Sequence, residues 1–330
     1  LMDNQFLSVR DLVVEYSSDG SRIQAVNGIS FDLEKGKTLG LVGETGAGKT
    51  TIAKAILRIL PDRSAKICSG EIVFEGENLL QLSEKKMRDV RGNKIAMIFQ
   101  DPMTALNPVK KLGEQIAEVI RIHNNISDSE AVKRAKEMLE LVGIPAARYN
   151  EYPHQFSGGM KQRVVIAIAL ACNPELLLAD EPTTALDVTI QAQVLEMIAD
   201  LKQKFQTSMI MITHDLGVIA ETCDDVAIIY AGQIVEYGSL EQIFDHPSHP
   251  YTIGLFGALP NMNVNEEWLH PIEGMTPDPS NLPHGCPFHP RCQYATEDCK
   301  RGKIEMVKTP DGHDCRCCNL SKVSTSKEEL

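Results

Sequence analysis

Residues Gly43 to Thr50 read GETGAGKT and fit the pattern G-x-x-x-x-G-K-[ST] at every position. Glycines at these spacings let consecutive backbone N–H groups converge on an anion, and a helix that follows adds the positive end of its dipole. The lysine supplies a point charge, and the threonine hydroxyl can ligate Mg²⁺. The eight residues therefore predict a nucleoside triphosphate site, with Lys49 between the β- and γ-phosphates and Thr50 on the metal.

Three further apolar segments end in polar side chains that suit such a site. KIAMIFQ ends at Gln100 and SMIMITH ends at His214, while ELLLADEP places Asp180 and Glu181 after its apolar residues. Ligands of open α/β sheets bind at the carboxyl ends of the strands. We predict that Asp180 holds Mg²⁺ through water and that Glu181 polarises the attacking water, with Gln100 contacting both and His214 hydrogen-bonded to the γ-phosphate.

Each of these four residues also has a plainer interpretation, as a solvated strand end or a helix cap. Their joint occurrence with the phosphate loop favours the catalytic one. The elements around them alternate: short apolar strands are separated by helices, which predicts a mostly parallel α/β sheet. Residues 5–16 and 69–80 are β-rich, and apolar residues three and four apart from Pro108 to Gly143 predict a helical insertion.

Composition limits the partners and the compartment. The chain has 330 residues and a formal net charge of -12, which argues against nucleic acid as a main partner. The longest apolar run, Val164–Cys172, is about half of the roughly 18 residues needed to span a bilayer. The first residues, LMDNQFLSVRDL, lack the basic start and apolar stretch of a signal peptide. We therefore expect a cytoplasmic protein whose thiols stay reduced.

The segment FSGGMKQR, from Phe156 to Arg163, precedes LLLADEPTTALD in the sequence. With the phosphate loop, Gln100 and His214 in this order, residues 6–245 resemble the ATPase subunit of an ABC transporter. The resemblance implies a RecA-like P-loop NTPase core, an antiparallel β-subdomain, and a helical subdomain at about residues 103–171. It also implies that two such domains sandwich ATP head to tail. Met160 departs from the family, which usually has Gln there.

The resemblance assigns roles to the residues that match its motifs. The catalytic residues would be Glu181, His214, Gln100 and Lys49, and the magnesium ligands Thr50, Gln100 and Asp180. Tyr16 would stack on adenine, and the FSGGMKQR signature would complete the site of the opposite subunit. The nucleotide-binding residues would be Tyr16, Gly43, Glu44, Thr45, Gly46, Ala47, Gly48, Lys49, Thr50, Thr51, Ser157, Gly158, Gly159 and Asp187. The residue types of the signature suit this role. Ser157 can cap a helix, and the glycines that follow it leave backbone N–H groups accessible to an anion.

Two further segments, MIFQDPMTALNP and HPSHPYTIGLFGALP, look like those of the dipeptide and oligopeptide importers. This branch implies an ATPase that powers peptide import from the cytoplasmic face of the membrane. Its partners would be two transmembrane permease subunits, docked on the segment after Gln100, and a second ABC ATPase subunit, which we expect to be a homologous chain or this chain itself. An extracytoplasmic peptide-binding protein would act indirectly, and no nucleic acid is expected.

Two alternatives to this function stay open. One is an importer of nickel or another small solute, because such importers share much of the extension. The other is a soluble, non-transport ABC ATPase that acts on ribosomes or DNA, or one with a redox tail. Such soluble ATPases often carry two cassettes or basic insertions, whereas this chain has one cassette and is acidic.

We place the ABC ATPase domain at residues 1–245 and a C-terminal extension with a small, separate Cys-rich domain at residues 246–330. Six of the nine cysteines fall between His284 and Cys318 of this extension. This segment has few large apolar residues, so it needs a cross-link, such as a disulfide or a bound metal group, to keep a stable fold. Reducing cytosol disfavours disulfides. Structural zinc sites usually show C-x₂₋₄-C, whereas C-x₅-C-x₆-C occurs here, a spacing that iron–sulfur clusters tolerate. Spacing alone leaves zinc and iron–sulfur open.

The resemblance favours the cluster. The tail of the peptide-importer ATPases carries the same first three cysteines and a fourth after H-x-x-x, which here follows His313. It therefore implies a mainly structural [4Fe–4S] cluster, with Zn²⁺ as the alternative. The implied ligands are Cys286, Cys292, Cys299 and Cys317. Cys315 and Cys318 are rivals for the fourth position.

Overall fold

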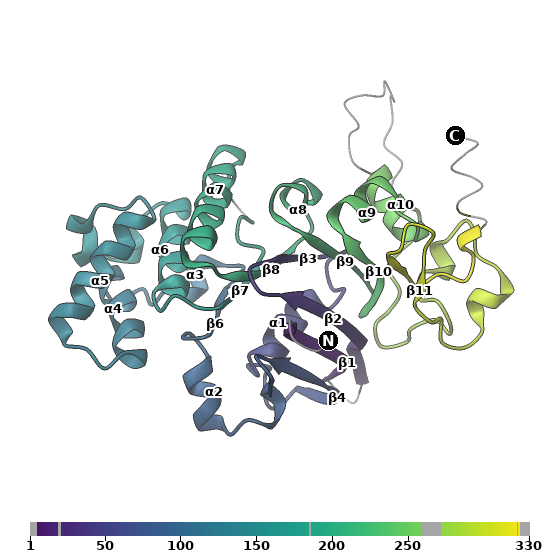
Figure 1. Cartoon of the computed structure of the whole chain (residues 1–330), viewed down its shortest axis with the longest axis horizontal. Coiled ribbons are helices and arrows are strands. Elements are labelled where there is room, and N and C mark those ends of the chain that lie inside the picture. Colours follow the sequence, from purple (N-terminus) through teal and green to yellow (C-terminus); the bar gives the residue numbers. More distant parts are fainter. Residues whose placement is uncertain (1–4, 19–20, 185, 259–271, 322, 324–330) are drawn as a thin grey trace. The chain divides into compact units, whose positions relative to one another are not determined.

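The computed structural model describes residues 5–18, 21–184, 186–258, 272–321 and 323 (Figure 1). The chain folds into two compact units, each formed from several chain segments. Unit 1 comprises Leu1–Leu7, Asp32–Leu39 and Val73–Thr222, and unit 2 comprises Ser8–Phe31, Gly40–Ile72 and Cys223–Leu330. Within the described residues, no helix combines the length and the apolar character that a membrane crossing requires.

Unit 1 contains the parallel strands β6 (Ile95–Ile98), β7 (Leu176–Asp180) and β8 (Ser208–Thr213). β7 lies between the other two, with Ile95 opposite Leu176 and Leu176 opposite Ser208. Every residue of the three strands is buried, as continuous apolar runs of parallel sheets usually are. The parallel pairing predicted for these segments is confirmed.

Most of the helices of the chain also belong to unit 1, and the predicted helical segment is confirmed. α4 and α5 pack against one another, and both contact α6 (Figure 1). The helices of this segment are α3 (Pro102–Ala105), α4 (Leu112–His123), α5 (Asp128–Leu141), η2 (Ala146–Asn150), η3 (Pro153–Gln155) and α6 (Gly158–Leu170). The others are η1 (Leu79–Gln81), α2 (Glu84–Val90), α7 (Val188–Phe205) and α8 (Leu216–Thr222).

Two long strands run through both units. They are β1 (Gln5–Ser18), which was predicted, and β2 (Ser21–Glu34), which was not. In unit 2, β2, β1 and β4 (Ala65–Phe74) lie side by side in that order. The end of β4 pairs antiparallel with β5 (Glu77–Asn78) in unit 1. β3 (Thr38–Val42), which is buried throughout, leads into the phosphate loop and α1 (Lys49–Ile56).

Unit 2 contains the antiparallel end of an eight-stranded sheet with the strand order β11-β12-β10-β9-β3-β8-β7-β6, in which β9 (Asp225–Tyr230) pairs antiparallel with β10 (Gln233–Ser239). Residues of the Cys-rich segment extend this sheet: β12 (Asp314–Cys315) pairs with β10, and β11 (Val307–Lys308) pairs with β12. The remaining elements are α9 (Leu240–Asp245), α10 (Pro250–Gly257), η4 (His289–Arg291) and η5 (Glu297–Lys300). Residues after 245 thus belong to unit 2 with the phosphate loop, and a separate Cys-rich C-terminal domain is not supported.

The segment from His284 to Cys318 has few large apolar residues, and a buried carboxylate, that of Glu236, helps to attach it to the sheet. The register of β10 shifts between Ile234 and Glu236. Glu236 is fully buried and accepts hydrogen bonds from the backbone N–H groups of Ser248 and His249 and contacts His313 Nε2 at 2.9 Å. One carboxylate therefore ties β10 to the start of α10 and to the segment before β12.

Candidate functional site

The phosphate loop has the shape that its sequence predicts. The loop ends at Gly48, in the left-handed region with φ 99°, and α1 begins at Lys49. A Cβ atom on Gly48 would lie 2.2 Å from the Ala25 carbonyl oxygen, and one on Gly43 would lie 2.1 Å from that of Ile229. Neighbouring backbone therefore admits only glycine at both ends of the loop.

Lys49 is buried and lies over its own loop, since its Nζ donates hydrogen bonds to the carbonyl oxygens of Gly43 (2.6 Å) and Glu44 (3.0 Å). Tyr16, on β1, contacts α1 through its hydroxyl, 3.4 Å from Thr51 Oγ1. Unit 2 thus brings together the predicted adenine-stacking ring and the predicted phosphate loop. An ammonium held this way can add a fixed positive charge to the loop amides.

In unit 1, three of the four predicted strand-end residues meet at one carboxylate. Glu181 Oε2 accepts hydrogen bonds from Gln100 Nε2 at 2.9 Å and from Thr184 Oγ1 at 2.8 Å. Its other oxygen, Oε1, is 3.3 Å from His214 Nδ1. The Glu181 backbone is in the left-handed region, with φ 47°, which is strained for a non-glycine residue and is typical of functional positions. Asp180, one residue before it, is buried at the end of β7.

Thr184 was missed by the sequence analysis, although it lies three residues after Glu181 in the segment EPTT. Gln162 was missed as well: it is buried on α6, and its Nε2 donates a hydrogen bond to the Pro182 carbonyl oxygen at 2.6 Å. The signature helix is therefore joined directly to the turn that carries Glu181. The available signal for Thr184 was a hydroxyl three residues after the predicted catalytic carboxylate, Glu181, whereas the sequence held no signal for Gln162.

The signature segment forms a capped helix start. Ser157 is the N-cap of α6, and its Oγ accepts a hydrogen bond from Met160 N at 3.4 Å. A Cβ atom on Gly158 would meet nothing within 4 Å, so this side of the helix start is open. The Met160 sulfur accepts a hydrogen bond from Arg148, whose guanidinium lies 4.0 Å from the centre of the Phe156 ring. Met160 is therefore integrated into local packing.

Asp187, predicted to bind nucleotide, is the N-cap of α7. Its Oδ1 accepts a hydrogen bond from Ile190 N at 3.0 Å. This bond gives Asp187 a structural role within its own unit, which by itself accounts for an aspartate at a helix start.

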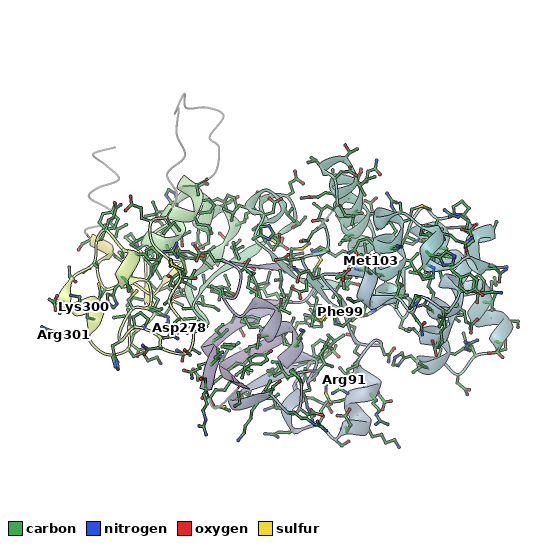
Figure 2. All side chains as sticks on the ribbon, turned by 180° about the vertical axis from the view of Figure 1, so that it is seen from behind. Arg91, Phe99, Met103, Asp278, Lys300 and Arg301 are labelled. Atoms are coloured by element: carbon green, nitrogen blue, oxygen red, sulfur yellow. The ribbon has the colours of Figure 1, made fainter. Side chains whose placement is uncertain are left out.

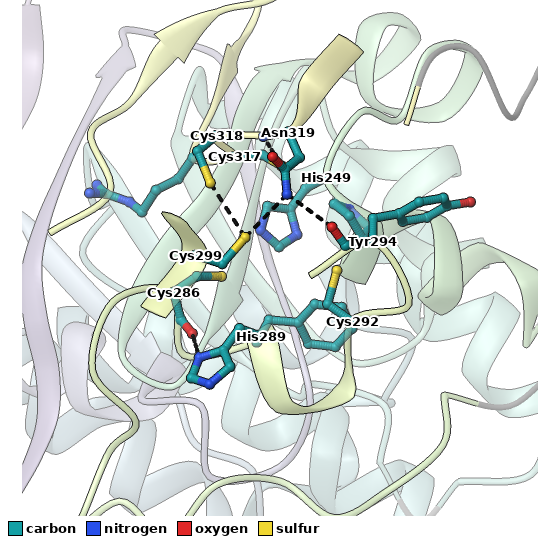
Figure 3. A pocket seen from close by; sticks show the side chains of 12 residues that line it. His249, Cys286, His289, Cys292, Tyr294, Cys299, Cys317, Cys318 and Asn319 are labelled. Carbon is teal, nitrogen blue, oxygen red and sulfur yellow. Dashed lines mark hydrogen bonds between the residues drawn. The ribbon is translucent and has the colours of Figure 1, made fainter. Parts of the chain in front are cut away.

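Five of the six clustered cysteines line one small pocket in unit 2, with a volume of about 10 Å³. Figure 3 labels all of them around this space: Cys286, Cys292, Cys299, Cys317 and Cys318. The Sγ atoms of Cys299 and Cys318 are 3.4 Å apart. Cys317 also lines the pocket, whereas Cys315 lies fully buried on β12 and is not among the lining residues.

Hydrogen bonds from N–H groups surround the sulfurs. Asn319 Nδ2 donates to Cys299 Sγ at 3.2 Å (Figure 3). The backbone N–H of Thr296 donates to Cys299 Sγ, and that of Asn319 donates to Cys317 Sγ. Burial raises the pKa of Cys286 and of Cys317 to about 11. For Cys299, burial also acts to raise the pKa, but hydrogen bonds from Thr296 and Cys318 bring it below its usual value.

A preformed metal site is not present in the part of the chain that the structure describes. No group of three or more His, Cys, Asp or Glu side chains there is arranged to hold a metal ion. A volume of about 10 Å³ holds roughly one water molecule. The predicted [4Fe–4S] cluster and its zinc alternative therefore stay predictions.

Comparisons with known proteins identify the families that this chain resembles. The family model described as ABC transporter matches residues 26–184, and the model described as oligopeptide/dipeptide transporter, C-terminal region, matches residues 235–299. The chain is 52% identical over 312 residues to the oligopeptide transport ATP-binding protein OppD of Bacillus subtilis, covering 94% of this chain and 87% of that protein. It is 49% identical over 313 residues to the dipeptide transport ATP-binding protein DppD of the same organism, covering 94% of this chain and 93% of that protein.

Among solved structures, the chain is similar to the ATP-binding cassette MJ0796 in a dimeric post-hydrolysis state bound to ADP and phosphate. The TM-score is 0.64 at 25% sequence identity, and the match covers 71% of this chain and 98% of that one.

Proposed function

This chain belongs to the ABC transporter family, among the ATP-binding proteins of oligopeptide and dipeptide transport, and on this basis we propose that it hydrolyses ATP to power peptide import. The observation that carries the proposal is the Glu181 carboxylate. Gln100 and Thr184 hold one of its oxygens, and His214 faces the other. A carboxylate fixed in this way is suited to orient water for attack on a phosphoryl group.

The remaining roles follow from the chemistry of ATP. Lys49 and the amides of the phosphate loop bind the β- and γ-phosphates, and Tyr16 stacks on adenine. Mg²⁺ would be held by Thr50, Gln100 and Asp180, and would neutralise charge on the phosphates. The hydrogen bond from Thr184 keeps Glu181 Oε2 occupied, so that Oε1 is the oxygen that can accept a proton from water. His214 donates to the γ-phosphate.

We propose that two ATPase subunits act together, with the signature of each completing the phosphate site of the other. The open approach to Gly158 supports a role in anion binding, because helix N-termini favour negative charge. Two permease subunits would dock on the segment after Gln100. Phe99, Met103 and Val109 near it are exposed by 39%, 63% and 80%, which suits an interface (Figure 2 labels the first two). The protein would lie on the cytoplasmic face of the membrane.

Peptide import is tested with a deletion strain that is auxotrophic for one amino acid. We expect it to stop growing on a di- or oligopeptide that contains this amino acid, and to recover when the chain is supplied. The control is growth on the free amino acid, which should be unaffected. Loss of nickel uptake with peptide growth unchanged would instead favour the nickel importer, and co-purification with RNA rather than membrane proteins would favour a soluble ATPase.

We also propose that the clustered thiols bind a [4Fe–4S] cluster that staples the C-terminal segment. Thiolates are the ligands that such clusters need, and all four predicted ligands line one pocket. N–H groups donate hydrogen bonds to two of their sulfurs, those of Cys299 and Cys317. The present cavity is too small for a cluster, so we expect loading to move the sulfurs apart. Cys286, Cys292, Cys299 and Cys317 would hold it.

Metal and sulfide analysis of anaerobically purified protein tests this assignment. We expect about four irons and four sulfides per chain, and a large loss of both in C286S, C292S, C299S and C317S. The matched control is C315S, because Cys315 does not line the pocket. Loss of iron in C318S but not in C317S would show that Cys318, and not Cys317, is the fourth ligand. One zinc per chain without sulfide would establish the alternative.

A further inference from the structure

Residues of the C-terminal segment bind Glu44 of the phosphate loop. Arg291 NH1 donates to both carboxylate oxygens of Glu44, at 3.2 and 3.0 Å, and NH2 donates to Oε1 at 3.2 Å. The Arg291 side chain is only 7% exposed, and that of Glu44 is 27% exposed. A guanidinium bound to two oxygens at low exposure is a strong and geometrically specific contact.

Arg291 is itself held in place. Its Nε donates to the Glu273 carbonyl oxygen at 3.1 Å, and NH1 donates to the Tyr230 hydroxyl at 3.3 Å. Its guanidinium carbon lies 5.9 Å from the ring centres of both Tyr230 and Phe288. These contacts fix the Arg291 guanidinium in place. The position of the Glu44 carboxylate therefore depends on Arg291.

A second contact holds the backbone of the same residue. The Glu44 N–H donates to the Tyr251 hydroxyl at 3.0 Å. Tyr251 is fully buried, with its ring centre 4.6 Å from that of Tyr230 and 5.4 Å from that of Phe288. Side chain and backbone of Glu44 are thus both fixed by residues that follow the cassette in the sequence.

The contact with Glu44 is continuous with the cysteine-lined pocket. Arg291 ends the short helix η4 and directly precedes Cys292. Phe288 and His289 line the pocket, and His289 Nδ1 is 2.9 Å from the Cys286 carbonyl oxygen. The backbone that carries Arg291 is therefore continuous with the residues that line the pocket.

Electrostatics gives this pair a function. A carboxylate on a loop that binds a triphosphate repels the ligand over distances up to about 8–10 Å in physiological salt. The Arg291 guanidinium neutralises the Glu44 charge. We propose that Arg291 is a positioning residue of the nucleotide site, and that through it ATP affinity depends on the arrangement of the cysteine-lined segment. This inference rests on ATP binding at the phosphate loop, but not on which group the thiols bind.

Binding of Mg-ATP to four variants, measured by calorimetry, tests the pair. We expect Arg291→Ala to weaken binding roughly tenfold, a typical coupling between sites. Glu44→Gln should have a smaller effect, and the double variant should bind more tightly than Arg291→Ala alone, because the unpaired carboxylate is gone. The control is Arg301→Ala. Arg301 is 75% exposed, forms an ion pair with Asp298 at a distance of 3.6 Å, and lies at the outer edge of the same segment (Figure 2).

Hydrogen exchange separates positioning from a purely structural role. By linkage, saturating Mg-ATP should slow exchange of the amides between residues 286 and 299 in the parent protein and not in Arg291→Ala. A lowered melting temperature with unchanged ATP affinity would overturn the inference, and so would a double variant that binds more weakly than both single ones. A parent protein that binds no ATP would instead overturn the proposed function.

Discussion

Glu181→Gln is expected to reduce kcat for ATP hydrolysis by roughly 100- to 10,000-fold, the usual contribution of a general base, and to leave ATP affinity within about twofold. Glutamine keeps the size of the side chain and an oxygen that can still accept from Gln100 and Thr184. It cannot take a proton from water. The measurement is steady-state phosphate release together with equilibrium binding of Mg-ATP.

The control for this variant is Glu175→Gln. Glu175 immediately precedes the same strand, β7, whereas Glu181 follows its end, and it pairs on the surface with Lys35 and Lys94 at 3.4 and 3.5 Å. Exposed pairs of this kind contribute little, so both kcat and affinity should be near those of the parent. Hydrolysis at the parental rate by Glu181→Gln would show that another group activates the water.

Gly48→Ala is expected to abolish ATP binding, with a loss of at least roughly 100-fold, and to lower the free energy of unfolding by roughly 2–5 kcal/mol. The added Cβ would lie 2.2 Å from the Ala25 carbonyl oxygen, and the residue would also have to keep a φ of 99°. Backbone must therefore shift in the loop that converges on the phosphates. Calorimetric titration with Mg-ATP and chemical denaturation measure the two effects.

Gly46→Ala separates the clash from the backbone strain. Gly46 has a φ of 84°, but a Cβ atom there would meet nothing within 4 Å. Its cost should be only the strain of the left-handed conformation, about 1–2 kcal/mol. If Gly48→Ala bound ATP as well as Gly46→Ala, the close approach of Ala25 would not determine the shape of the loop.

The residues that chemistry requires could be identified from local sequence. The phosphate loop is contiguous, and Gln100, Glu181 and His214 each follow a short apolar segment. A parallel sheet aligns the ends of its strands, so the type and place of these residues were enough to predict one shared site at that edge. Gln100, Glu181 and His214 do meet there. The same reasoning predicted the parallel strands and the helical segment.

Contacts between segments far apart in the chain could not be identified in this way. Glu44 and Arg291 are separated by 247 positions, and no periodicity near Arg291 indicates its partner. Pairing of β12 with β10 places the Cys-rich residues in unit 2, where sequence analysis predicted a separate domain. The same fold distinguishes Cys315 from the cysteines that line the pocket.

Local patterns thus determined which side chains are candidates to bind and cleave a triphosphate, because neighbours in the chain create a loop, a strand end or a helix cap. Tertiary structure alone decided which distant groups hold those side chains. Charge pairing, burial and hydrogen bonding at such positions depend on which distant segments the fold brings into contact, and the sequence near each residue does not specify those segments.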